Sequence, residues 1–428
     1  MTIGDSLRIA CWLIRLNRSQ RWSRDRIRQY QSSALTRILR HAVTTVPYYR
    51  SFGLDGNAIT SPDDLTKFPV MTKHDVQDLG DKLLSSDFIR SELNHSRTSG
   101  TSGEPTTTYY DRDCWLLSKY ALKIHRMLGN GIGLFKSIVI VSEQSPRQLK
   151  DIGRLAGSGF LFKQRFLSIH ESIDEHIPLF RDPGINALYA FPSYLDDLIN
   201  HCEAEKVSLP TISIVFTSSE VLQDALRTRI ESFFGCRVCD VYGSTEFKEI
   251  AWQCVQGTYH LNFESVFIEP APDDGADSGA ANDILVTSLT NRAMPLIRFR
   301  IGDECTLSSE ACPCGLASSS LFNISGRNID MVRLPGEQRI SPYLLTAAIE
   351  SSDEIAKYQI VQTSLHDLEV RYVAKTRCLS ADEVKSIESA VRIHLGDTMK
   401  IGVRAVPAIP RTAAGKHQVF VQAIGSEA

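Results

Sequence analysis

The pattern of apolar and polar residues along this chain changes near residue 246, from alternating strands and helices to mainly strands. Before that point, short β-branched runs are bounded by polar turn residues, a pattern typical of strands. Four such runs are expected as strands: 137–141, 185–190, 212–216 and 237–241. Stretches with helical periodicity lie between them. Strands that alternate with helices predict an α/β body.

Two of the helical stretches carry a clear apolar stripe. Ser193 is expected as the N-cap of the first helix, whose inner face is Leu195, Leu198, Ile199 and Cys202. Gly235 is expected to end the second helix, whose inner face is Leu222, Leu226, Ile230 and Phe233. We assign both stripes to the core and give them no chemical role.

After residue 246 the pattern is rich in strands, expected at 259–268, 284–288 and 296–301. The first two are joined by 270–279, which reads as a surface turn. From about residue 328 a separate α+β unit is expected, with helices at 341–351 and 381–395 and strands at 359–363 and 369–374. The predicted fold class is therefore α/β, with a large N-terminal α/β body and an added β-rich subdomain (1–327), followed by a small α+β C-terminal domain (328–428).

Composition limits the possible functions. A chain of 428 residues with 43% hydrophobic content is long enough for two or more domains. Its net charge of −3 and pI near 6.4 give no excess of positive charge of the kind that binds nucleic acid. No segment looks able to span a membrane, because the apolar stretch 9–16 is short and contains Arg15. We expect a cytoplasmic protein without a transmembrane segment.

The first forty residues differ from the rest in carrying nine arginines interleaved with apolar side chains. One interpretation is a basic amphipathic helix that contacts an anionic membrane surface or a partner. The other is an N-terminal helix that packs on its own domain.

A short loop rich in glycine and hydroxyl groups is the first candidate for chemistry. It reads Thr98, Ser99, Gly100, Thr101, Ser102 and Gly103. Glycine lets the backbone approach a ligand closely, and its N–H groups can face an anion. The four hydroxyls can donate to phosphate oxygens. The segment therefore reads as a phosphate loop or as an ordinary turn, and it is not a Walker A loop because no lysine lies inside it.

Two further motifs place a carboxylate shortly after a glycine. The first is Tyr242, Gly243, Ser244, Thr245 and Glu246, in which the ring can stack on a purine and the carboxylate can hold Mg²⁺. The second is the strand 298–303, which ends in Gly302 and Asp303; its carboxylate can accept hydrogen bonds from both ribose hydroxyls. Each motif also has a plain interpretation, as the exit of a strand or as a surface turn.

The last two motifs are 325–330, which contains Arg327, and 410–416, which contains Lys416 in a Pro/Thr/Gly loop. With all five motifs in this order, the chain resembles the adenylate-forming ligase superfamily. Within it, the chain is similar to the branch of phenylacetate-CoA ligase, coenzyme F390 synthetase and CapK proteins. The resemblance runs from about residue 30 to residue 420 and includes the segments 35–50 and 68–73.

The resemblance implies a role for each motif. It assigns 98–103 to the β- and γ-phosphates of ATP, Tyr242 to adenine, and Thr245 to the α-phosphate or the acyl carboxylate. It assigns Glu246 to Mg²⁺ and Asp303 to the ribose. Arg327 would lie at the domain junction, Asp330 at a hinge, and Lys416 would reach in from a mobile C-terminal domain.

The sequence departs from the branch at three places near these motifs. Glu104 and Thr106 stand where relatives often have lysine, and Gln418 with Val419 replaces a basic position beyond Lys416. These changes concern the handling of pyrophosphate and the choice of acceptor. They leave the adenylation residues intact.

The chemistry implied is ATP-dependent activation of a carboxylic acid. Because the carboxylate and the α-phosphate are both anions, catalysis depends on neutralising and positioning charge, with Lys416, Glu246 and Thr245 as the catalytic set. The leading hypothesis passes the acyl group to CoA, as an AMP-forming acid-thiol ligase. Two alternatives stay open: an amide- or ester-forming ligase that uses an amine, hydroxyl or carrier protein in a capsule or natural-product pathway, and a non-catalytic nucleotide-binding scaffold.

The acid itself is not identified by the sequence. The resemblance expects it beside Tyr242, against the segment 189–193 and the turn 218–220. Aromatic walls there suit an aryl acid, whereas Glu220 can meet the amine of an amino-acid-like substrate. A homodimer is also left open.

Four residues form a possible metal site separate from the ATP motifs. Cys254 and His260 are followed some fifty residues later by Cys312 and Cys314. Three thiolates and an imidazole suit a closed tetrahedral Zn²⁺ site, and some members of the branch bind metal at matching places. The alternative is a set of buried free thiols, since Cys-x-Cys is tighter than the common finger spacing and Leu316 replaces an arginine found in relatives.

Overall fold

The computed structural model describes residues 2–97, 106–142, 163–169, 171–272, 283–324, 332–335, 339–340, 342, 345, 348–349, 352, 354–396, 398–410 and 418–424. Contacts divide the chain into two compact units. Unit 1 comprises Met1–Ile301 and Cys305–Ile324, and unit 2 comprises Gly302–Glu304 and Ser325–Ala428. The predicted boundary between residues 327 and 328 lies outside the described residues.

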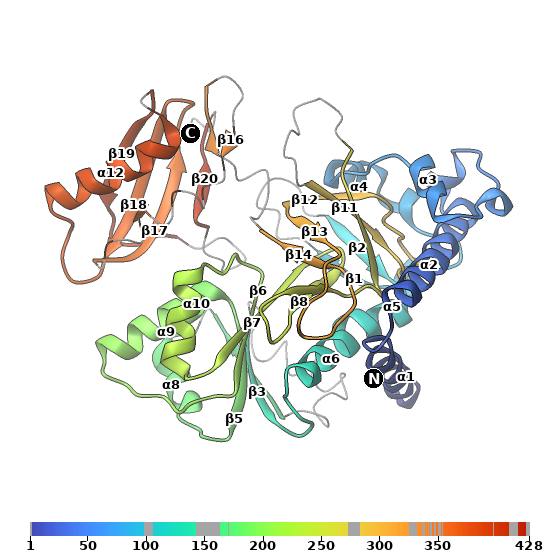
Figure 1. The fold of residues 1–428 in the computed structure, drawn as a ribbon, viewed down its shortest axis with the longest axis horizontal. Helices are drawn as coiled ribbons and strands as arrows, with labels where there is room; N and C mark the ends of the chain where they lie inside the picture. Colours follow the sequence, from blue (N-terminus) through green and yellow to red (C-terminus); the bar gives the residue numbers. More distant parts are fainter. Residues whose placement is uncertain are drawn as a thin grey trace. The chain divides into compact units, whose positions relative to one another are not determined.

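Within the described residues, the largest sheet has nine strands in the order β13-β14-β9-β8-β7-β6-β5-β3-β4 (Figure 1). Its parallel part consists of β3 (Ser137–Ser142), β4 (Lys163–Ser168), β5 (Ile185–Ala190), β6 (Ile214–Ser218) and β7 (Arg237–Ser244). Its antiparallel part consists of β8 (Lys248–Gln253), β9 (Tyr259–Leu261), β13 (Thr306–Ser308) and β14 (Ser320–Phe322). The direction therefore reverses between β7 and β8.

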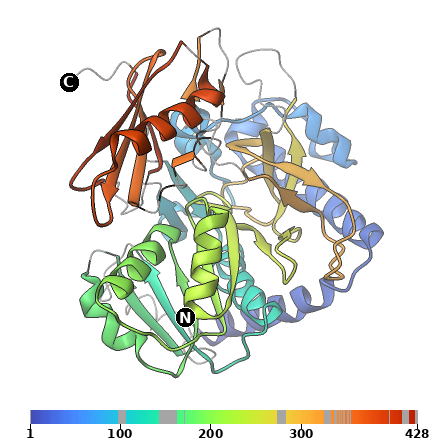
Figure 2. The same ribbon diagram turned by 60° about the vertical axis from the view of Figure 1, so that its left-hand side comes forward.

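Helices cover both faces of the parallel strands because neighbouring residues along each strand point to opposite faces. Val139, Leu188 and Val215 pack on one face against α8 (Ile173–Phe180), α9 (Pro192–Ala204) and α10 (Asp224–Phe234). Ile138, Ala187 and Phe216 pack on the other face against α1 (Ile3–Ser19), α5 (Arg112–Leu116) and α6 (Leu122–Gly129). Figure 2 shows the first group of helices against the sheet.

The predicted apolar stripe of α9 is buried. In the stripe predicted for α10, Ile230 is buried, Leu226 and Phe233 are partly buried, and Leu222 lies before the helix. The predicted N-cap of α9 is wrong. The helix begins two residues earlier, at Pro192, with Phe191 as N-cap. Proline suits the first helical position because the lost N–H would have no helical partner there. Ser193 instead donates its hydroxyl and its N–H to the carboxylate of Glu220. Gly235 does end α10, in the left-handed conformation with φ of 61°.

The β-rich part of unit 1 differs from the prediction at two strands. The expected strand 259–268 is divided into β9 and β10 (Val266–Pro270), because the chain turns at Asn262, whose carbonyl accepts the N–H of Ser265 at 2.9 Å. The expected strand 296–301 begins later, as β12 (Phe299–Glu304), after Arg298 with φ of 52°. Within the described residues, β10 and β12 pair with β11 (Asp283–Ser288) in a three-stranded sheet of order β10-β11-β12.

The N-terminal segment packs on its own domain along one face. Ile9 and Leu16 of α1 belong to the core beneath the sheet, and the carboxylate of Asp5 accepts two hydrogen bonds from Arg112. The outer face of α1 leaves Ile3, Leu7 and Ile14 exposed. The next helices, α2 (Arg24–Thr45), α3 (Pro47–Arg50) and α4 (Lys73–Leu79), pack on the β-rich part. A hairpin of β1 (Asn94–Arg97) and β2 (Thr107–Tyr110) brackets the predicted phosphate loop.

Unit 2 is built on a sheet of order β19-β18-β17-β20 in its described part. The strands are β17 (Ile355–Gln362), β18 (Asp367–Ala374), β19 (Lys400–Ala405) and β20 (Phe420–Gln422). Helix α12 (Ala381–Leu395) begins and ends where the sequence predicts, capped by Ser380 and Gly396, and packs Ile387 and Val391 on the sheet. A small ribbon pairs β15 (Val332–Arg333) with β16 (Arg339–Ile340). Across the described chain, every helix falls short of the length or the apolar character needed to cross a membrane.

The reversal from β7 to β8 depends on one glycine. Gly243 pairs with Glu249 across a bulge, and a Cβ built on Gly243 would lie 1.9 Å from the carbonyl oxygen of Lys248. No side chain fits into that distance. Lys248 itself has φ of 64°, a conformation that costs about 1–3 kcal/mol for a residue with a side chain. The two backbones therefore approach closely only because residue 243 is glycine.

A buried ion pair fixes the next residue of β8. Arg126 of α6 donates two hydrogen bonds to the carboxylate of Glu249, at 3.2 and 3.0 Å, and their side chains are only 2% and 7% exposed. The guanidinium also lies over the ring of Phe216, 4.5 Å from its centre. Helix α6 is thus joined to β8 through charge as well as apolar packing.

We predict that Gly243→Ala destabilises unit 1 by about 1–3 kcal/mol, because the new methyl group displaces the Lys248 carbonyl. Thermal unfolding followed by circular dichroism measures the change. Gly133→Ala is the matched control, since a Cβ there meets no atom within 4 Å. Equal midpoints for the two variants would contradict the close approach.

We predict that Glu249→Gln lowers stability by about 3 kcal/mol, because Arg126 keeps its charge in a buried place without a counter-charge. The control is Asp25→Asn, which removes the partner of Arg28 in a pair with side chains 85% and 72% exposed and should cost less than about 1 kcal/mol. Denaturant unfolding of both variants tests the difference, and similar losses would refute it.

Candidate functional site

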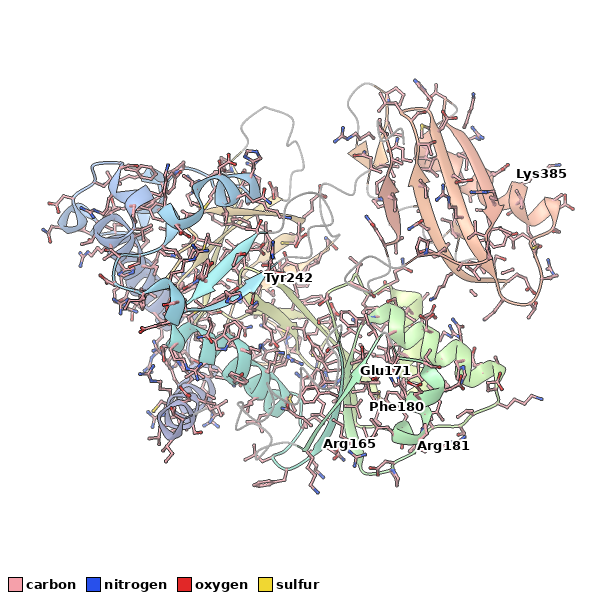
Figure 3. All side chains as sticks on the ribbon, turned by 180° about the vertical axis from the view of Figure 1, so that it is seen from behind. Arg165, Glu171, Phe180, Arg181, Tyr242 and Lys385 are labelled. Carbon is pink, nitrogen blue, oxygen red and sulfur yellow. The ribbon has the colours of Figure 1, made fainter. Side chains whose placement is uncertain are left out.

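The turn after β7 brings the second predicted motif into one compact structure. Tyr242 lies buried at the end of the strand, near the carboxyl ends of the parallel strands (Figure 3). The hydroxyl oxygen of Ser244 accepts the N–H groups of Glu246 and Phe247, both at 3.2 Å. The Thr245 carbonyl accepts a hydrogen bond from the hydroxyl of Tyr110. These bonds hold Thr245 and Glu246 in a defined turn.

Glu246 has the properties of a ligand for a hard cation. The residue is buried, yet within the described part of the chain its carboxylate makes no hydrogen bond and no ion pair. A buried carboxylate is costly unless cations neutralise it, and the nearby ammonium group of Lys248 supplies one positive charge. Mg²⁺ prefers oxygen ligands and is commonly held by one or two carboxylates together with substrate phosphates. The residues present therefore fit the Mg²⁺ that the sequence predicts.

Lys248, which the sequence reasoning missed, belongs to the same turn. Its ammonium group donates to the hydroxyl of Ser96 at 2.5 Å and lies 5.0 Å from the ring centre of Tyr110. Burial, together with the nearby charge of Lys119, lowers the pKa of Lys248 to about 7. Ser96 is on β1, the strand that leads into the predicted phosphate loop. A lysine two residues beyond Glu246 was the available signal in the sequence.

The segments expected to border the acid also meet in the structure. The hydroxyl of Tyr189, at the end of β5, contacts the hydroxyl of Ser218, at the end of β6, at 2.5 Å. Glu220 accepts two hydrogen bonds from Ser193, at 2.8 and 2.9 Å. Its carboxylate therefore holds the start of α9, which is a structural task beside any contact with a substrate.

The positions of several predicted site residues relative to this turn are not described. The loop Thr98–Gly103, Arg327, Asp330 and Lys416 lie outside the described residues. Asp303 is buried on β12, beside Gly302 with φ of 79°, in the short stretch that groups with unit 2. Their assignments stay predictions.

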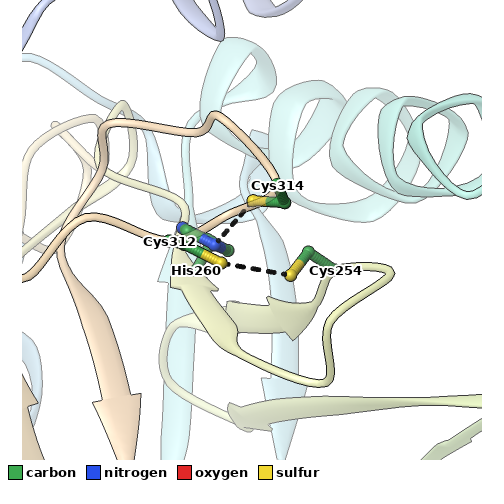
Figure 4. Close-up of side chains that lie close together, drawn as sticks. All are labelled: Cys254, His260, Cys312 and Cys314. Atoms are coloured by element: carbon green, nitrogen blue, oxygen red, sulfur yellow. Dashed lines mark hydrogen bonds between the residues drawn. The ribbon is translucent and has the colours of Figure 1, made fainter.

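The four predicted metal ligands converge (Figure 4). One ligand atom from each of Cys254, His260, Cys312 and Cys314 lies within 4.8 Å of the others. The Cys254 and Cys312 sulfurs are 3.8 Å apart, too far for a disulfide, and the Cys314 sulfur is 3.2 Å from Nε2 of His260. Two thiolates on one tetrahedral zinc ion would lie about 3.8 Å apart, given bonds of about 2.3 Å.

The surroundings of the cluster also suit a metal. The sulfur of Cys254 accepts the N–H of Gln256 at 3.3 Å, and that of Cys314 accepts the N–H of Leu316 at 3.4 Å. Nδ1 of His260 lies 3.1 Å from the hydroxyl of Ser318, which leaves Nε2 facing the sulfurs. Burial lowers the pKa of His260, so the imidazole is neutral, as a ligand must be. Cys254 closes the β8–β9 hairpin, and Cys312 and Cys314 lie between β13 and β14.

Comparison with known proteins gives consistent similarities. The family model of the CapK C-terminal domain matches residues 334–423 of this chain. Phenylacetate-coenzyme A ligase of Thermus thermophilus is 23% identical, over 92% of this chain and 96% of its own. Protein CapK of Staphylococcus aureus is 22% identical, over 87% of this chain and 83% of its own.

A solved structure shows the same fold. The crystal structure of 2-hydroxyisobutyryl-CoA ligase in the postadenylation state, in complex with R3-HIB-AMP, superposes with a TM-score of 0.77 at 20% identity, over 95% of this chain and 91% of that chain. The predicted α/β fold class with a C-terminal domain is confirmed by this likeness. Over most of its length the chain is thus similar to phenylacetate-CoA ligases and to protein CapK, the branch of adenylate-forming ligases that the sequence predicts.

Proposed function

We propose that this protein is an AMP-forming carboxylate ligase, which activates a carboxylic acid with ATP to an acyl-adenylate and transfers the acyl group to CoA. The observation that carries the proposal is the turn after β7. It combines a buried aromatic ring at a strand end, Tyr242, with a buried carboxylate, Glu246, that forms no hydrogen bond and no ion pair in the described chain. The relatives named as phenylacetate-coenzyme A ligases and the acyl-AMP bound to the related ligase support the same reaction.

The reaction has two steps. In the first, a carboxylate oxygen of the acid attacks the α-phosphorus of ATP, the bond to the β-phosphate breaks, and pyrophosphate leaves. In the second, the sulfur of CoA attacks the acyl carbon, and AMP leaves. Mg²⁺, when bound, offsets the charge of the phosphates. Tyr242 orients the nucleotide by stacking, and Thr245, fixed by Tyr110, faces the α-phosphate or the acid.

The remaining roles rest on the family resemblance. Thr98 to Gly103 bind the β- and γ-phosphates, Asp303 binds the ribose, and Arg327 lies near the ribose at the domain junction. Lys416, carried by the C-terminal domain 328–428, neutralises charge between the carboxylate and the α-phosphate. This domain swings between adenylation and acyl transfer. The need for ATP and CoA favours a cytoplasmic protein.

A second acceptor class remains a candidate because of one relative. Similarity to protein CapK extends over 87% of this chain, and the matched model is a CapK C-terminal domain. In this alternative the adenylate passes to an amine, a hydroxyl or a carrier protein instead of CoA. Consumption of CoA thiol in step with AMP release separates the two.

We propose further that the four-residue cluster holds a structural zinc ion. All four positions are taken by protein ligands, which leaves none open for a substrate and fits a structural rather than a catalytic site. The ion would tie the end of β8 to the loop between β13 and β14. It takes no part in the two chemical steps.

We predict that the protein releases AMP, and not ADP, from MgATP with one class of carboxylic acid, and that hydroxylamine traps the acyl group as a hydroxamate. Mass spectrometry of nucleotides over a broad acid panel measures this. Lys416→Ala and Glu246→Gln should each lower the rate about 10²- to 10³-fold, because each removes charge stabilisation of the transition state. Both should keep the wild-type unfolding midpoint. Release of ADP, or wild-type rates in both variants, would reject the ligase in favour of a scaffold.

We predict about one equivalent of zinc in protein purified without chelator, because three thiolates and a neutral imidazole bind it tightly. Cys314→Ser should lose most of the metal and lower the unfolding midpoint. Cys378→Ser, which changes an exposed cysteine outside the cluster, should do neither. Elemental analysis by mass spectrometry decides the point, and less than about a tenth of an equivalent in the wild type would leave free thiols as the correct interpretation.

A further inference from the structure

Three lysines, Lys119, Lys123 and Lys248, gather beside the candidate active site, where the nearby carboxylates are Glu246 and Glu249. Lys119 and Lys248 both lie over the ring of Trp115, with their ammonium nitrogens 4.5 and 5.9 Å from its centre. Lys123 lies over the ring of Tyr189, 5.6 Å from its centre. Within the described residues, none of the three forms an ion pair or a hydrogen bond to a carboxylate.

The two acidic residues near these lysines, Glu246 and Glu249, have other roles in the structure. Glu249 is engaged by two hydrogen bonds from Arg126, and Glu246 belongs to the turn that we assign to the nucleotide and its cation. Arg126 itself adds a positive charge next to Tyr189, 5.4 Å from the ring centre. Like charges held together repel one another, so an arrangement of this kind is unfavourable until an anion arrives.

The helix that carries two of these lysines is irregular at this place. Between α5 and α6 the chain forms a π-helical turn, Leu117–Ala121, which contains Lys119. The hydroxyl of Ser118 donates to the carbonyl of Cys114 at 2.7 Å, so a side chain bonds the helix backbone in this region. π-Helical turns are rare in proteins, and those that occur are often located at functional sites. Lys123 follows four residues after Lys119, on the same side of the helix.

Of the two lysines on the helix, Lys119 is half-buried and Lys123 is exposed. Desolvation, and then the charge of Lys123, lowers the pKa of Lys119 to about 8. Desolvation and the charge of Arg126 likewise lower the pKa of Lys123, against the opposite effect of Glu249, although solvent reaches its side chain. The charged forms are therefore poorly compensated by the protein alone.

We propose that Lys119 and Lys123 form a subsite for a second anionic group on the acid substrate, so that the substrate is a dicarboxylic acid or a comparable dianion with an organic body. This rests on the proposed function. Lys123 faces Tyr189, whose hydroxyl contacts Ser218, the two segments expected to border the acid. The rings of Trp115 and Tyr189 provide apolar walls for the organic body.

The other source of negative charge in this reaction is the triphosphate of ATP. Lys248 contacts Ser96, on the strand that leads to the predicted phosphate loop, so it is placed nearer to that source. Lys119 and Lys123 come from the helix, and Lys123 contacts the ring at the end of β5. The test therefore uses these two residues and not Lys248.

The experiment compares acids that differ only by the second charge: phenylacetate with 4-carboxyphenylacetate, and hexanoate with adipate. AMP release gives kcat/KM for each acid and KM for ATP, and calorimetry gives equilibrium binding of each acid without turnover. The variants are Lys119→Gln, Lys123→Gln and Lys123→Arg, with the exposed Lys82→Gln as the control.

The wild type should prefer the dianion of at least one pair about tenfold or more, the effect of one charge-assisted hydrogen bond. Lys119→Gln and Lys123→Gln should remove that preference and leave the monocarboxylate within about twofold. Lys123→Arg should restore it, and Lys82→Gln should keep it.

Three outcomes would overturn the subsite: no preference for either dianion, equal losses for both acids of a pair, or a raised KM for ATP with an unchanged acid preference. The last result would assign the lysines to the phosphates. If no acid releases AMP but dianions bind in a lysine-dependent way, the proposed function fails and the subsite stands. If dianions do not bind in calorimetry either, both fail.

Discussion

The candidate active site depends on the contact of two backbones, those of Gly243 and Lys248. Because residue 243 has no side chain, the Lys248 carbonyl approaches to a distance that a Cβ would not tolerate. The chain between them is therefore forced into a short turn, in which the Ser244 hydroxyl satisfies two N–H groups. That turn gives Thr245 and Glu246 their fixed positions. The unfavourable φ of Lys248 is part of the same geometry.

Strand β8 is held at three successive places, and each uses a different kind of interaction. Its start is fixed by the approach to Gly243, and its second residue, Glu249, by the buried pair with Arg126. Its far end leads into Cys254, one of the four converging ligands. The candidate metal site thus lies at the far end of the strand that begins at the candidate catalytic turn. Rigid support of this kind is what positioning of charged reactants requires.

Charge around the turn is unevenly distributed, although the chain as a whole is nearly neutral, with a net charge of −3. Among the described residues, the carboxylates near Lys123, Lys248 and Arg126 are Glu246 and Glu249. A site that receives an acid and ATP must accept several negative charges, and fixed cations do so without reorganisation during the reaction. The subsite that we propose for a second anionic group uses the two cations on the helix, Lys119 and Lys123.

The sequence by itself determined the elements and the motifs. Short β-branched runs predicted β3 and β5, and the helical spacing of apolar residues predicted α10, because burial of one face of a helix imposes that spacing. The order of the short motifs indicated adenylation, because it resembles the order found in adenylate-forming ligases. The four metal-ligand candidates could be named because thiolates and imidazole are the ligands that zinc prefers.

The tertiary structure decided what depends on contacts between distant segments. Sequence could not show that Glu220 is bound to Ser193, that Arg126 is paired with Glu249, or that Lys119 and Lys248 share the ring of Trp115. Local pattern also missed the break of the predicted strand 259–268, since a turn at Asn262 within an apolar run does not interrupt the hydrophobic signal. Local spacing fixes which face of an element is buried, and only the packed chain fixes which charges meet.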